Sequence, residues 1–262
     1  MPGVASFYEP DGAGYLASEL TRGPWDPGAQ HAGPPAALLG RELELLPEAE
    51  DFQICRLTFE ILRSIPIGPV EVEARIARLG RRVQMLEGEL RVGGETLMMV
   101  RAWRLRTAPV DLPEDAVAIP PGPALPADPG PAAFFPTGES VGYHTAMEVR
   151  FNSGGFTEIG PATAWLRMRQ PLVGDEPISP LQRVLVAADV GNGISAAVDF
   201  RKFLFVNVDL TVQLERLPEG EWVCVDAITL PRPRGNATAE SVLGDERGRL
   251  GRALQTLLVA ER

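Results

Sequence analysis

The sequence contains few of the residues that form disulfides, metal sites or nucleic-acid contacts. There are two cysteines and two histidines among 262 residues, and the net charge is −10. Cys55 and Cys224 both lie in strand-like segments, so we expect small core residues rather than a disulfide, and no Cys/His spacing is typical of zinc. An acidic chain also lacks the basic footprint of a nucleic-acid-binding protein. The composition therefore predicts no metal, no cofactor and no nucleic-acid partner.

Long apolar runs are also missing from the sequence. No run reaches the roughly 18 residues that a membrane span requires. No charged start followed by an apolar core marks a secretory signal peptide. With 45% hydrophobic and 23% charged residues, the composition is that of an ordinary globular protein. We therefore expect a cytoplasmic location and no membrane span.

A helix predicted over residues 178–191 organises what the sequence does contain. Its start is marked by a serine cap, a proline at the first helical position and a glutamine that completes a capping box, namely Ser179, Pro180 and Gln182. Its body is apolar on nearly every side, so other structure should surround it, and Gly191 is expected to end it. Asp189 is the exception, because the helix dipole and burial both disfavour a carboxylate in this last turn. It therefore either points into water or takes part in chemistry.

The rest of the chain divides into two similar halves. A helix over residues 35–46 precedes alternating segments in the first half, and similar segments flank the organising helix in the second. We expect strands at residues 15–21, 57–61, 70–76, 83–92 and 97–105, and then at residues 147–151, 162–169, 203–214, 221–229, 237–243 and 252–259. This order indicates an α+β unit in which a curled antiparallel sheet wraps a helix.

Residues 107–137 separate the two halves. They hold nine of the chain's 25 prolines, which predicts an extended linker on the surface. Similar letters recur on either side of it, since Leu57-Thr58-Phe59 corresponds to Leu210-Thr211-Val212. A long unit that occurs twice indicates a duplicated domain. We therefore expect an N-terminal unit at residues 1–106, the linker, and a C-terminal unit at residues 138–262.

This arrangement resembles the double hotdog fold, and the sequence resembles the type II acyl-CoA thioesterase (TesB-like) family. The resemblance covers residues 10–106 and 140–260. It rests on three segments, which are Ala187-Ala188-Asp189, Phe205-Val206-Asn207-Val208-Asp209-Leu210 and Ala253-Leu254-Gln255-Thr256-Leu257. It implies two tandem hotdog units that form one long sheet, and hydrolysis of fatty acyl-CoA in fatty acid metabolism. Acyl-CoA is then the expected partner, and a homo-oligomer is left open.

The same resemblance implies the catalytic residues. The family positions a water with an Asp, a Thr or Ser (Asn in some members) and a Gln, which carry over to Asp189, Asn207 and Gln255. Asn207 departs from the usual hydroxyl. An apolar shell and the end of a helix would raise the pKa of Asp189 toward that of a useful base, and both amides can orient the water. The alternative is that Asp189 only caps the next turn and Gln255 only bonds a neighbouring strand.

Substrate binding requires hydrogen-bond donors at the thioester carbonyl. We expect a backbone N–H at Gly33, where the first helix begins, or in the turn that starts at Gly191. His31 lies beside Gly33 and is a candidate ligand contact, although a surface histidine is the simpler interpretation. Ala37 is predicted to stand in the first half where Asp189 stands in the second. We therefore expect one active site per chain.

Some interpretations remain open at this point. Met85, Met98, Met99 and Trp103 either line an apolar acyl tunnel or belong to the ordinary core. An enoyl-CoA hydratase would use an Asp and a His close together in a helix–loop segment, and residues 189–200 contain no histidine. A non-catalytic acyl-CoA or lipid-binding protein is the third alternative, which Asn207 in place of a hydroxyl keeps open. Release of CoA would separate hydrolysis from binding.

Overall fold

The N-terminal half consists of a helix and the strands that wrap it. The computed structural model describes residues 5–47, 49–128 and 137–262. In the first half the elements are β1 (Tyr8–Asp11), β2 (Gly14–Ala17), η1 (Glu19–Thr21), α1 (Gly33–Glu44), β3 (Phe52–Ile61), β4 (Pro69–Arg78), β5 (Val83–Val92) and β6 (Glu95–Arg106). Buried residues alternate with more exposed ones along β5 and β6, which is the pattern of a sheet with one face on a core.

The C-terminal half repeats this plan with additional short helices. Its elements, together with those of the linker, are η2 (Glu114–Ala116), α2 (Tyr143–Ala146), β7 (Met147–Ser153), β8 (Ala162–Met168), α3 (Pro180–Ala188), α4 (Gly191–Ile194), β9 (Phe203–Asn207), β10 (Asp209–Leu214), β11 (Val223–Arg232), β12 (Asn236–Asp245) and β13 (Gly248–Glu261). The α3 start is the predicted capping box, in which Ser179 Oγ accepts from the Gln182 N–H. Its end differs from the prediction. Gly191 does not stop the helix but begins α4, because Asp189 and Val190 keep helical backbone angles.

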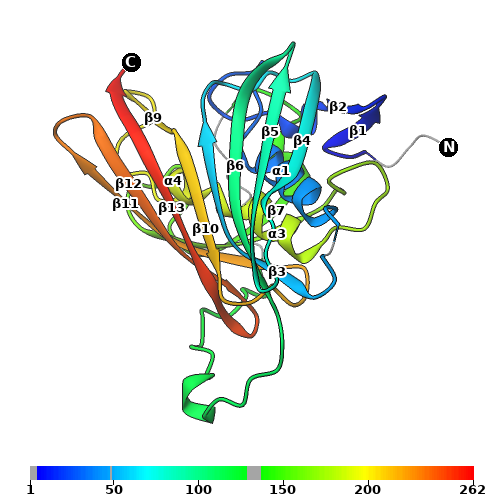
Figure 1. Cartoon of the computed structure of the whole chain (residues 1–262). Coiled ribbons are helices and arrows are strands. Elements are labelled where there is room, and N and C mark those ends of the chain that lie inside the picture. The colour runs from blue at the N-terminus through cyan, green and yellow to red at the C-terminus, as the bar shows by residue number, and fades with distance from the viewer. Residues whose placement is uncertain (1–4, 48, 129–136) are drawn as a thin grey trace.

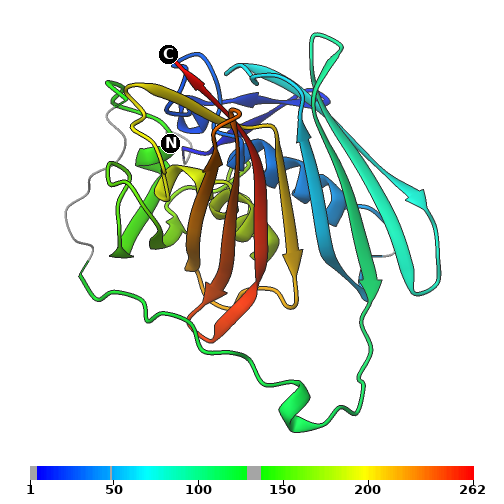
Figure 2. The same ribbon diagram turned by 90° about the vertical axis from the view of Figure 1, so that its left-hand side faces the viewer.

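All strands join one antiparallel sheet that curls around the helices. In the described residues the sheet has 13 strands, in the order β1-β2-β4-β5-β6-β3-β10-β13-β12-β11-β8-β7, with β9 on β13. Figure 1 shows α1 and α3 on the concave side of this sheet, and Figure 2 shows the two halves side by side. The predicted architecture of two helix-wrapping units with one continuous sheet is therefore present.

The two halves meet where the repeated letters of the sequence pair with each other. Strand β3 pairs with β10, placing Phe59 opposite Leu210 and Thr58 opposite Thr211. The two threonine hydroxyls lie 3.3 Å apart. Leu57, Phe59, Leu210 and Val212 are buried, so each copy of the repeat contributes its apolar face to the common core. Pairing of the two central strands also covers an edge that each unit would otherwise expose.

The helices α1 and α3 pack against each other in an antiparallel pair inside the sheet. A Cβ at Gly33 would lie 2.6 Å from the Val186 carbonyl oxygen, and a Cβ at Gly40 would lie 2.3 Å from Leu185 Cδ1. The glycines therefore allow the helix backbones to approach closely. At the far end, Ser179 Oγ donates to Glu44 Oε2 over 2.7 Å. This packing brings the N-terminus of α1 to the C-terminus of α3.

The described part of the linker runs along the outside of the C-terminal unit (Figure 2). Arg150 donates to the Pro126 carbonyl, Asn152 to the Ala124 carbonyl, and the Arg249 N–H to Pro120. Leu125 packs on a small cluster of Trp165, Trp222 and Cys224. Both cysteines are free thiols, and Cys224 is buried. None of the helices in the described ranges is long and apolar enough to cross a membrane.

Two of the predicted strands are partly wrong. The strand expected over residues 15–21 ends at Ala17, and the 3-10 helix η1 follows it. The strand expected over residues 203–214 is divided at Val208, whose N–H donates to Thr256 and whose carbonyl accepts from Ile61. Both pieces pair with β13, but only β10 continues to β3.

The predicted acyl tunnel lined by Met85, Met98, Met99 and Trp103 is also wrong, because these side chains do not share one face of the sheet. Met98 is buried, but Met99 is 39% exposed on the outer face, and Trp103, paired with Met85, shares that face by the two-residue period of strands.

Candidate active site

Asp189 lies where the C-terminus of α3 meets the N-terminus of α1. It is the C-cap residue of α3 and is 4% exposed. The backbone N–H groups of Ala32 and Gly33 donate toward its carboxylate. The unfavourable dipole of its own helix is therefore opposed by the favourable N-terminus of a second helix, which the sequence alone did not place there. Asp189 does not point into bulk water.

Asn207 and Gln255 hold one oxygen of this carboxylate. Asn207 Nδ2 donates to Asp189 Oδ1 over 2.9 Å, and Gln255 Nε2 donates to the same atom over 3.1 Å. Asn207 ends β9, while Gln255 projects inward from β13, where buried and exposed residues alternate. Gln255 Nε2 also contacts the Asp189 carbonyl, and its Oε1 accepts from the Asn192 N–H at 3.0 Å. The three residues that the family resemblance selected are thus brought together in space.

His31 contacts the other oxygen of Asp189. Its Nδ1 lies 3.1 Å from Asp189 Oδ2, and the side chain is 14% exposed. The ring stacks on Tyr143, with ring centres 4.0 Å apart and planes 5° apart, and the Gly33 N–H donates to Nδ1. The simpler interpretation as a surface histidine is therefore wrong, because packing of α1 on α3 buries the residue that precedes α1.

Burial determines the charge states of Asp189 and His31. Burial raises the pKa of Asp189 to about 7, although the donated hydrogen bonds from Asn207, Gln255, Gly33 and Ala32 lower it. Burial also lowers the pKa of His31 to about 3. Both groups therefore favour their neutral forms, and the contact below about pH 7 is a hydrogen bond rather than an ion pair. At neutral pH the carboxyl is near its midpoint, as a general base requires.

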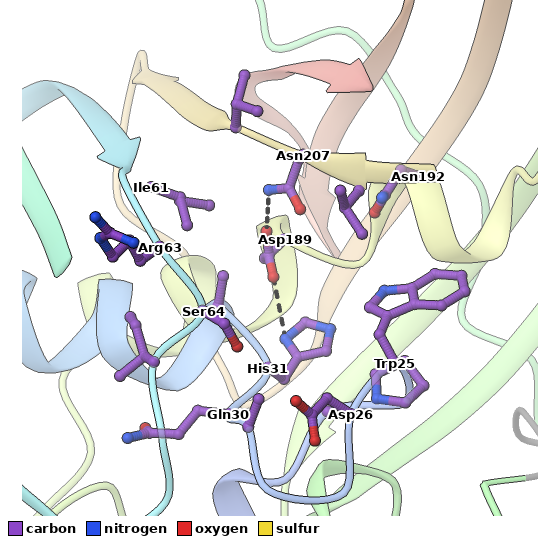
Figure 3. A pocket seen from close by; sticks show the side chains of 17 residues that line it. Trp25, Asp26, Gln30, His31, Ile61, Arg63, Ser64, Asp189, Asn192 and Asn207 are labelled. Carbon is purple, nitrogen blue, oxygen red and sulfur yellow. Dashed lines mark hydrogen bonds and ion pairs between the residues drawn. The ribbon is translucent and has the colours of Figure 1, made fainter. Parts of the chain in front are cut away.

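A cavity of about 280 Å³ opens beside this cluster. Figure 3 shows Asp189 in its wall with contacts to Asn207 on one side and His31 on the other. The remaining wall comes from three places, namely the segment before α1 with Trp25, Asp26 and Gln30, the end of β3 and the residues after it with Ile61, Arg63 and Ser64, and the C-terminal half with Asn192, Val206 and Val208. The cavity therefore lies between the two halves.

Two other expected binding residues lie behind the cavity wall rather than in it. Gly33 contributes its N–H to His31, and a Cβ on Gly191 would lie 2.6 Å from Ser241 Oγ and 3.0 Å from Gln255 Oε1.

Ala37 lies in the middle of α1 and is not the counterpart of Asp189. The residue at the end of α1 is Glu44, which accepts from Ser179 at the start of α3 and does not line the cavity.

Two parts of the cavity wall could not be identified from the sequence, namely the loop residues before α1 and Asn192. The loop residues Trp25 and Asp26 stand in a run of glycines and prolines that looked like a turn. In the sequence, Asn192 is only part of a glycine turn after the organising helix. Three residues after the predicted base, it carried no signal that distinguished it from an ordinary turn residue. Across the described residues no group of three His, Cys, Asp or Glu side chains could hold a metal ion.

Solved structures share this fold over nearly the whole chain. A Thermobifida fusca protein assigned to thioesterase II is 18% identical and covers 99% of each chain with a TM-score of 0.74. An Alicyclobacillus acidocaldarius protein with the hotdog fold is 17% identical and covers 97% of this chain and 95% of its own, with a TM-score of 0.66. An acyl-CoA thioesterase II from Mycobacterium marinum is 16% identical and covers 90% and 91%, with a TM-score of 0.63. The chain thus has the double hotdog fold.

Family models match both halves of the chain. The acyl-CoA thioesterase N-terminal domain matches residues 21–105, and the acyl-CoA thioesterase C-terminal domain matches residues 113–259. A comparison with curated protein sequences finds no significant match. The C-terminal domain model alone covers more than half of the chain, and the two models follow each other in the order of the two hotdog units. The chain therefore belongs to the TesB-like acyl-CoA thioesterase family and is a thioester hydrolase.

Proposed function

We propose that the protein hydrolyses acyl-CoA thioesters with a water that Asp189, Asn207 and Gln255 position. The observation that carries this proposal is the placement of Asp189, whose side chain is 4% exposed and lies in the wall of a cavity, with Oδ1 accepting from Asn207 and Gln255 and Oδ2 in contact with His31 Nδ1. A carboxylate in this setting is costly to bury. Its raised pKa gives it the basicity that water activation needs.

The proposed reaction starts from the deprotonated carboxylate. Asp189 takes a proton from the water while the water oxygen bonds to the thioester carbonyl carbon. The carbon–sulfur bond then breaks, and its electron pair leaves with the sulfur of CoA. No hydrogen bond engages the Asn207 amide oxygen in the described part of the chain, so this oxygen can accept a hydrogen bond from the second O–H of the water. Gln255 holds the Asp189 carboxylate in position through the hydrogen bond from its Nε2 to Oδ1.

The proposed substrate-binding residues act in different ways. His31 lines the cavity and contacts the substrate, whereas Gly33 and Gly191 act through close backbone approach. The proposed organisation keeps one active site per chain, with units at residues 1–106 and 138–262 joined by residues 107–137. A role in cytoplasmic fatty acid metabolism and assembly into a homo-oligomer remain predictions.

One observation favours a second activity on the same site. The hydratase alternative lacked a histidine near Asp189 in the sequence, but His31 now lies 3.1 Å from its carboxylate. An Asp–His pair can deliver water to an enoyl-CoA double bond. This reaction retains the carbon–sulfur bond, so it leaves CoA esterified. The binding-only alternative also releases no CoA.

Incubation with a panel of acyl-CoA substrates from acetyl to palmitoyl, with a thiol reagent present, tests the proposal. Hydrolysis releases free CoA, and the panel also defines the preferred chain length. Loss of crotonyl-CoA absorbance without a thiol signal would indicate hydration instead. Binding without either change would indicate a non-catalytic module. The matched control is Glu44→Gln, a change of the carboxylate at the end of α1 that does not line the cavity, and it should retain wild-type turnover.

A further inference from the structure

The expected backbone donors for the thioester carbonyl are already engaged. The Gly33 N–H donates to His31 Nδ1, the Asn192 N–H to Gln255 Oε1, and the Gly193 N–H to the Val190 carbonyl. A hydrogen bond within the protein removes a donor from the cavity. The negative charge that develops on the carbonyl oxygen needs donors aimed at it. The backbone donors expected at Gly33 and in the turn at Gly191 are therefore already used within the protein, and side-chain donors in the cavity wall can take their place.

Asn192 has an unpartnered side-chain amide at the cavity. The residue is only 5% exposed and lines the cavity wall. Its side-chain amide has no hydrogen bond among residues 5–47, 49–128 and 137–262, and it is not among the fully enclosed polar atoms. Burying an amide without a hydrogen-bond partner is unfavourable. A fold that retains such a group at the edge of a cavity has a donor and an acceptor available for a ligand.

Asn192 is also held rigidly beside the proposed base. It lies in α4, which follows Asp189 after a single intervening residue. Gln255 binds both the Asp189 carboxylate and the Asn192 N–H. In Figure 3 the amide end of Asn192 points into the region bounded by Asn207 and His31. The side chain that holds the base in place thus also fixes the donor, as preorganised stabilisation requires.

His31 supplies a second donor on the same wall. Because Gly33 donates to Nδ1, the neutral ring carries its proton on Nε2. The Nε2 atom has no other hydrogen bond within the described part of the protein. The stacked Tyr143 ring fixes its plane.

We propose that the Asn192 side-chain amide, with His31 Nε2–H beside it, donates to the carbonyl oxygen of the bound thioester. This inference rests on the proposed hydrolysis at the same site. When the water oxygen bonds to the carbonyl carbon, the carbonyl π electrons move onto oxygen, where these two donors receive the charge. The charge then returns to reform the carbonyl as the carbon–sulfur bond breaks and CoA leaves with the electron pair. Asp189 then passes the proton that it took from the water to the sulfur of the leaving CoA, which regenerates the base.

Kinetics of Asn192 variants give the first test. Asn192→Ala and Asn192→Leu, which keeps the branched shape, should each lower kcat on the order of 10²- to 10³-fold, the usual effect of losing one such donor. KM should change much less, because the interaction strengthens as charge develops. Asn236→Ala, at an exposed position in β12, should leave both constants unchanged. Thermal melts should show no loss of stability in the Asn192 variants, since no protein partner is lost.

An infrared measurement tests the contact itself. The probe is 2-oxopentyl-CoA with a ¹³C carbonyl, in which a methylene between sulfur and carbonyl prevents hydrolysis. Donation lowers the carbonyl frequency of the bound ketone, so the band should lie at higher wavenumber in Asn192→Ala, Asn192→Leu and His31→Ala than in the wild type. In Asp189→Asn it should stay close to its wild-type position.

The two measurements also separate failure of this inference from failure of the proposed function. A band at the same wavenumber in wild type and Asn192→Ala, or full kcat in both Asn192 variants, would overturn the role of Asn192. Absence of CoA release from every acyl-CoA tested would overturn the proposed hydrolysis. A shifted band in the wild type would then still support the carbonyl contact.

Discussion

At the scale of single residues, the charge state of Asp189 decides the chemistry. Its carboxylate receives hydrogen bonds from Asn207, Gln255 and the start of α1, all of which favour the ionised form. Burial nevertheless prevails and raises the pKa to about 7. The carboxyl is thus well oriented and still basic enough to take a proton from water, which an exposed aspartate with its ordinary pKa would do poorly.

Turnover should therefore follow the ionisation of Asp189. We expect kcat/KM to rise with pH through about 7 and then to level, because only the deprotonated carboxylate accepts the proton. Asp189→Asn should lower turnover on the order of 10²-fold or more and remove this step. The check is a pH–rate profile of both proteins. Full activity in Asp189→Asn would show that another group is the base.

The same pKa shift predicts a pH dependence of stability. Burial raises the pKa of Asp189 from its ordinary value of 3.8 to about 7 in the fold, so its contribution to stability is complete below about pH 4 and is lost as pH rises to about 7. Asp189→Asn lacks this loss. The melting temperature of Asp189→Asn relative to wild type should therefore increase from pH 5 to pH 8, as measured by thermal melts. A difference that is constant with pH would contradict the assigned shift.

Asn207 should tolerate the hydroxyl that is usual in the family. Asn207 Nδ2 donates to Asp189 Oδ1 and also to the Asp209 carbonyl, and threonine can replace one of these bonds. We expect Asn207→Thr to lose less than tenfold in kcat, and Asn207→Ala to lose on the order of 10²-fold, as the orientation of the water is lost. Steady-state hydrolysis of both variants provides the measurement. Equal rates for the two would remove Asn207 from the site.

At the scale of secondary-structure elements, the antiparallel pair of α1 and α3 builds the site. Each helix places a carboxylate from its C-terminal end against the start of the other. Asp189 faces Ala32 and Gly33, and Glu44 faces Ser179. Asp189 lines the cavity, whose wall also includes the segment before α1 and the ends of β3 and β9, whereas Glu44 does not line this cavity. The two ends of the helix pair therefore have a similar backbone arrangement, but only the Asp189 carboxylate lies in the wall of this cavity.

The close approach of these helices predicts the effect of a methyl group at their crossing. Gly33→Ala places a Cβ 2.6 Å from the Val186 carbonyl oxygen, which is backbone and cannot rotate away. We expect destabilisation by about 1–3 kcal/mol, as for other overpacked cores, together with reduced turnover because His31 moves with the chain. Gly122→Ala in the linker, whose Cβ would lie 3.6 Å from its nearest neighbour, is the control. Denaturant unfolding of both variants checks this, and an unchanged midpoint for Gly33→Ala would argue against the close crossing.

At the scale of the whole molecule, the two hotdog units form one functional body. Strand β3 pairs with β10 across the junction, and the cavity takes its wall from both halves. The described part of the linker contacts the outside of the C-terminal unit, and Thr107 at its start donates to the Asp51 carbonyl of the N-terminal unit. Its covalent continuity is therefore less important for the site than the shared core and sheet.

A chain cut in the linker should remain assembled and active. Val110 is 72% exposed and Leu112 is 53% exposed, so a protease site inserted after Asp111 is accessible. After cleavage we expect the two fragments to co-elute in size-exclusion chromatography and to keep most of the turnover, because the sheet pairing and the buried helix contact remain. Fragments that separate without denaturant would show that the linker holds the halves together.

The features that depend on local or periodic patterns could be predicted from the sequence. The cap of α3, the alternating strands, the duplication and the misfit of Asp189 in an apolar helix could all be read from residues near each other in the chain, because propensity and burial act locally. The tertiary structure decided which groups meet Asp189. His31, Glu44 and Asn192 gained or lost a role through the antiparallel packing of α1 on α3 and the break at Val208. These contacts join residues far apart in sequence, and they follow from how two apolar helices and one sheet fit together, which no local pattern encodes.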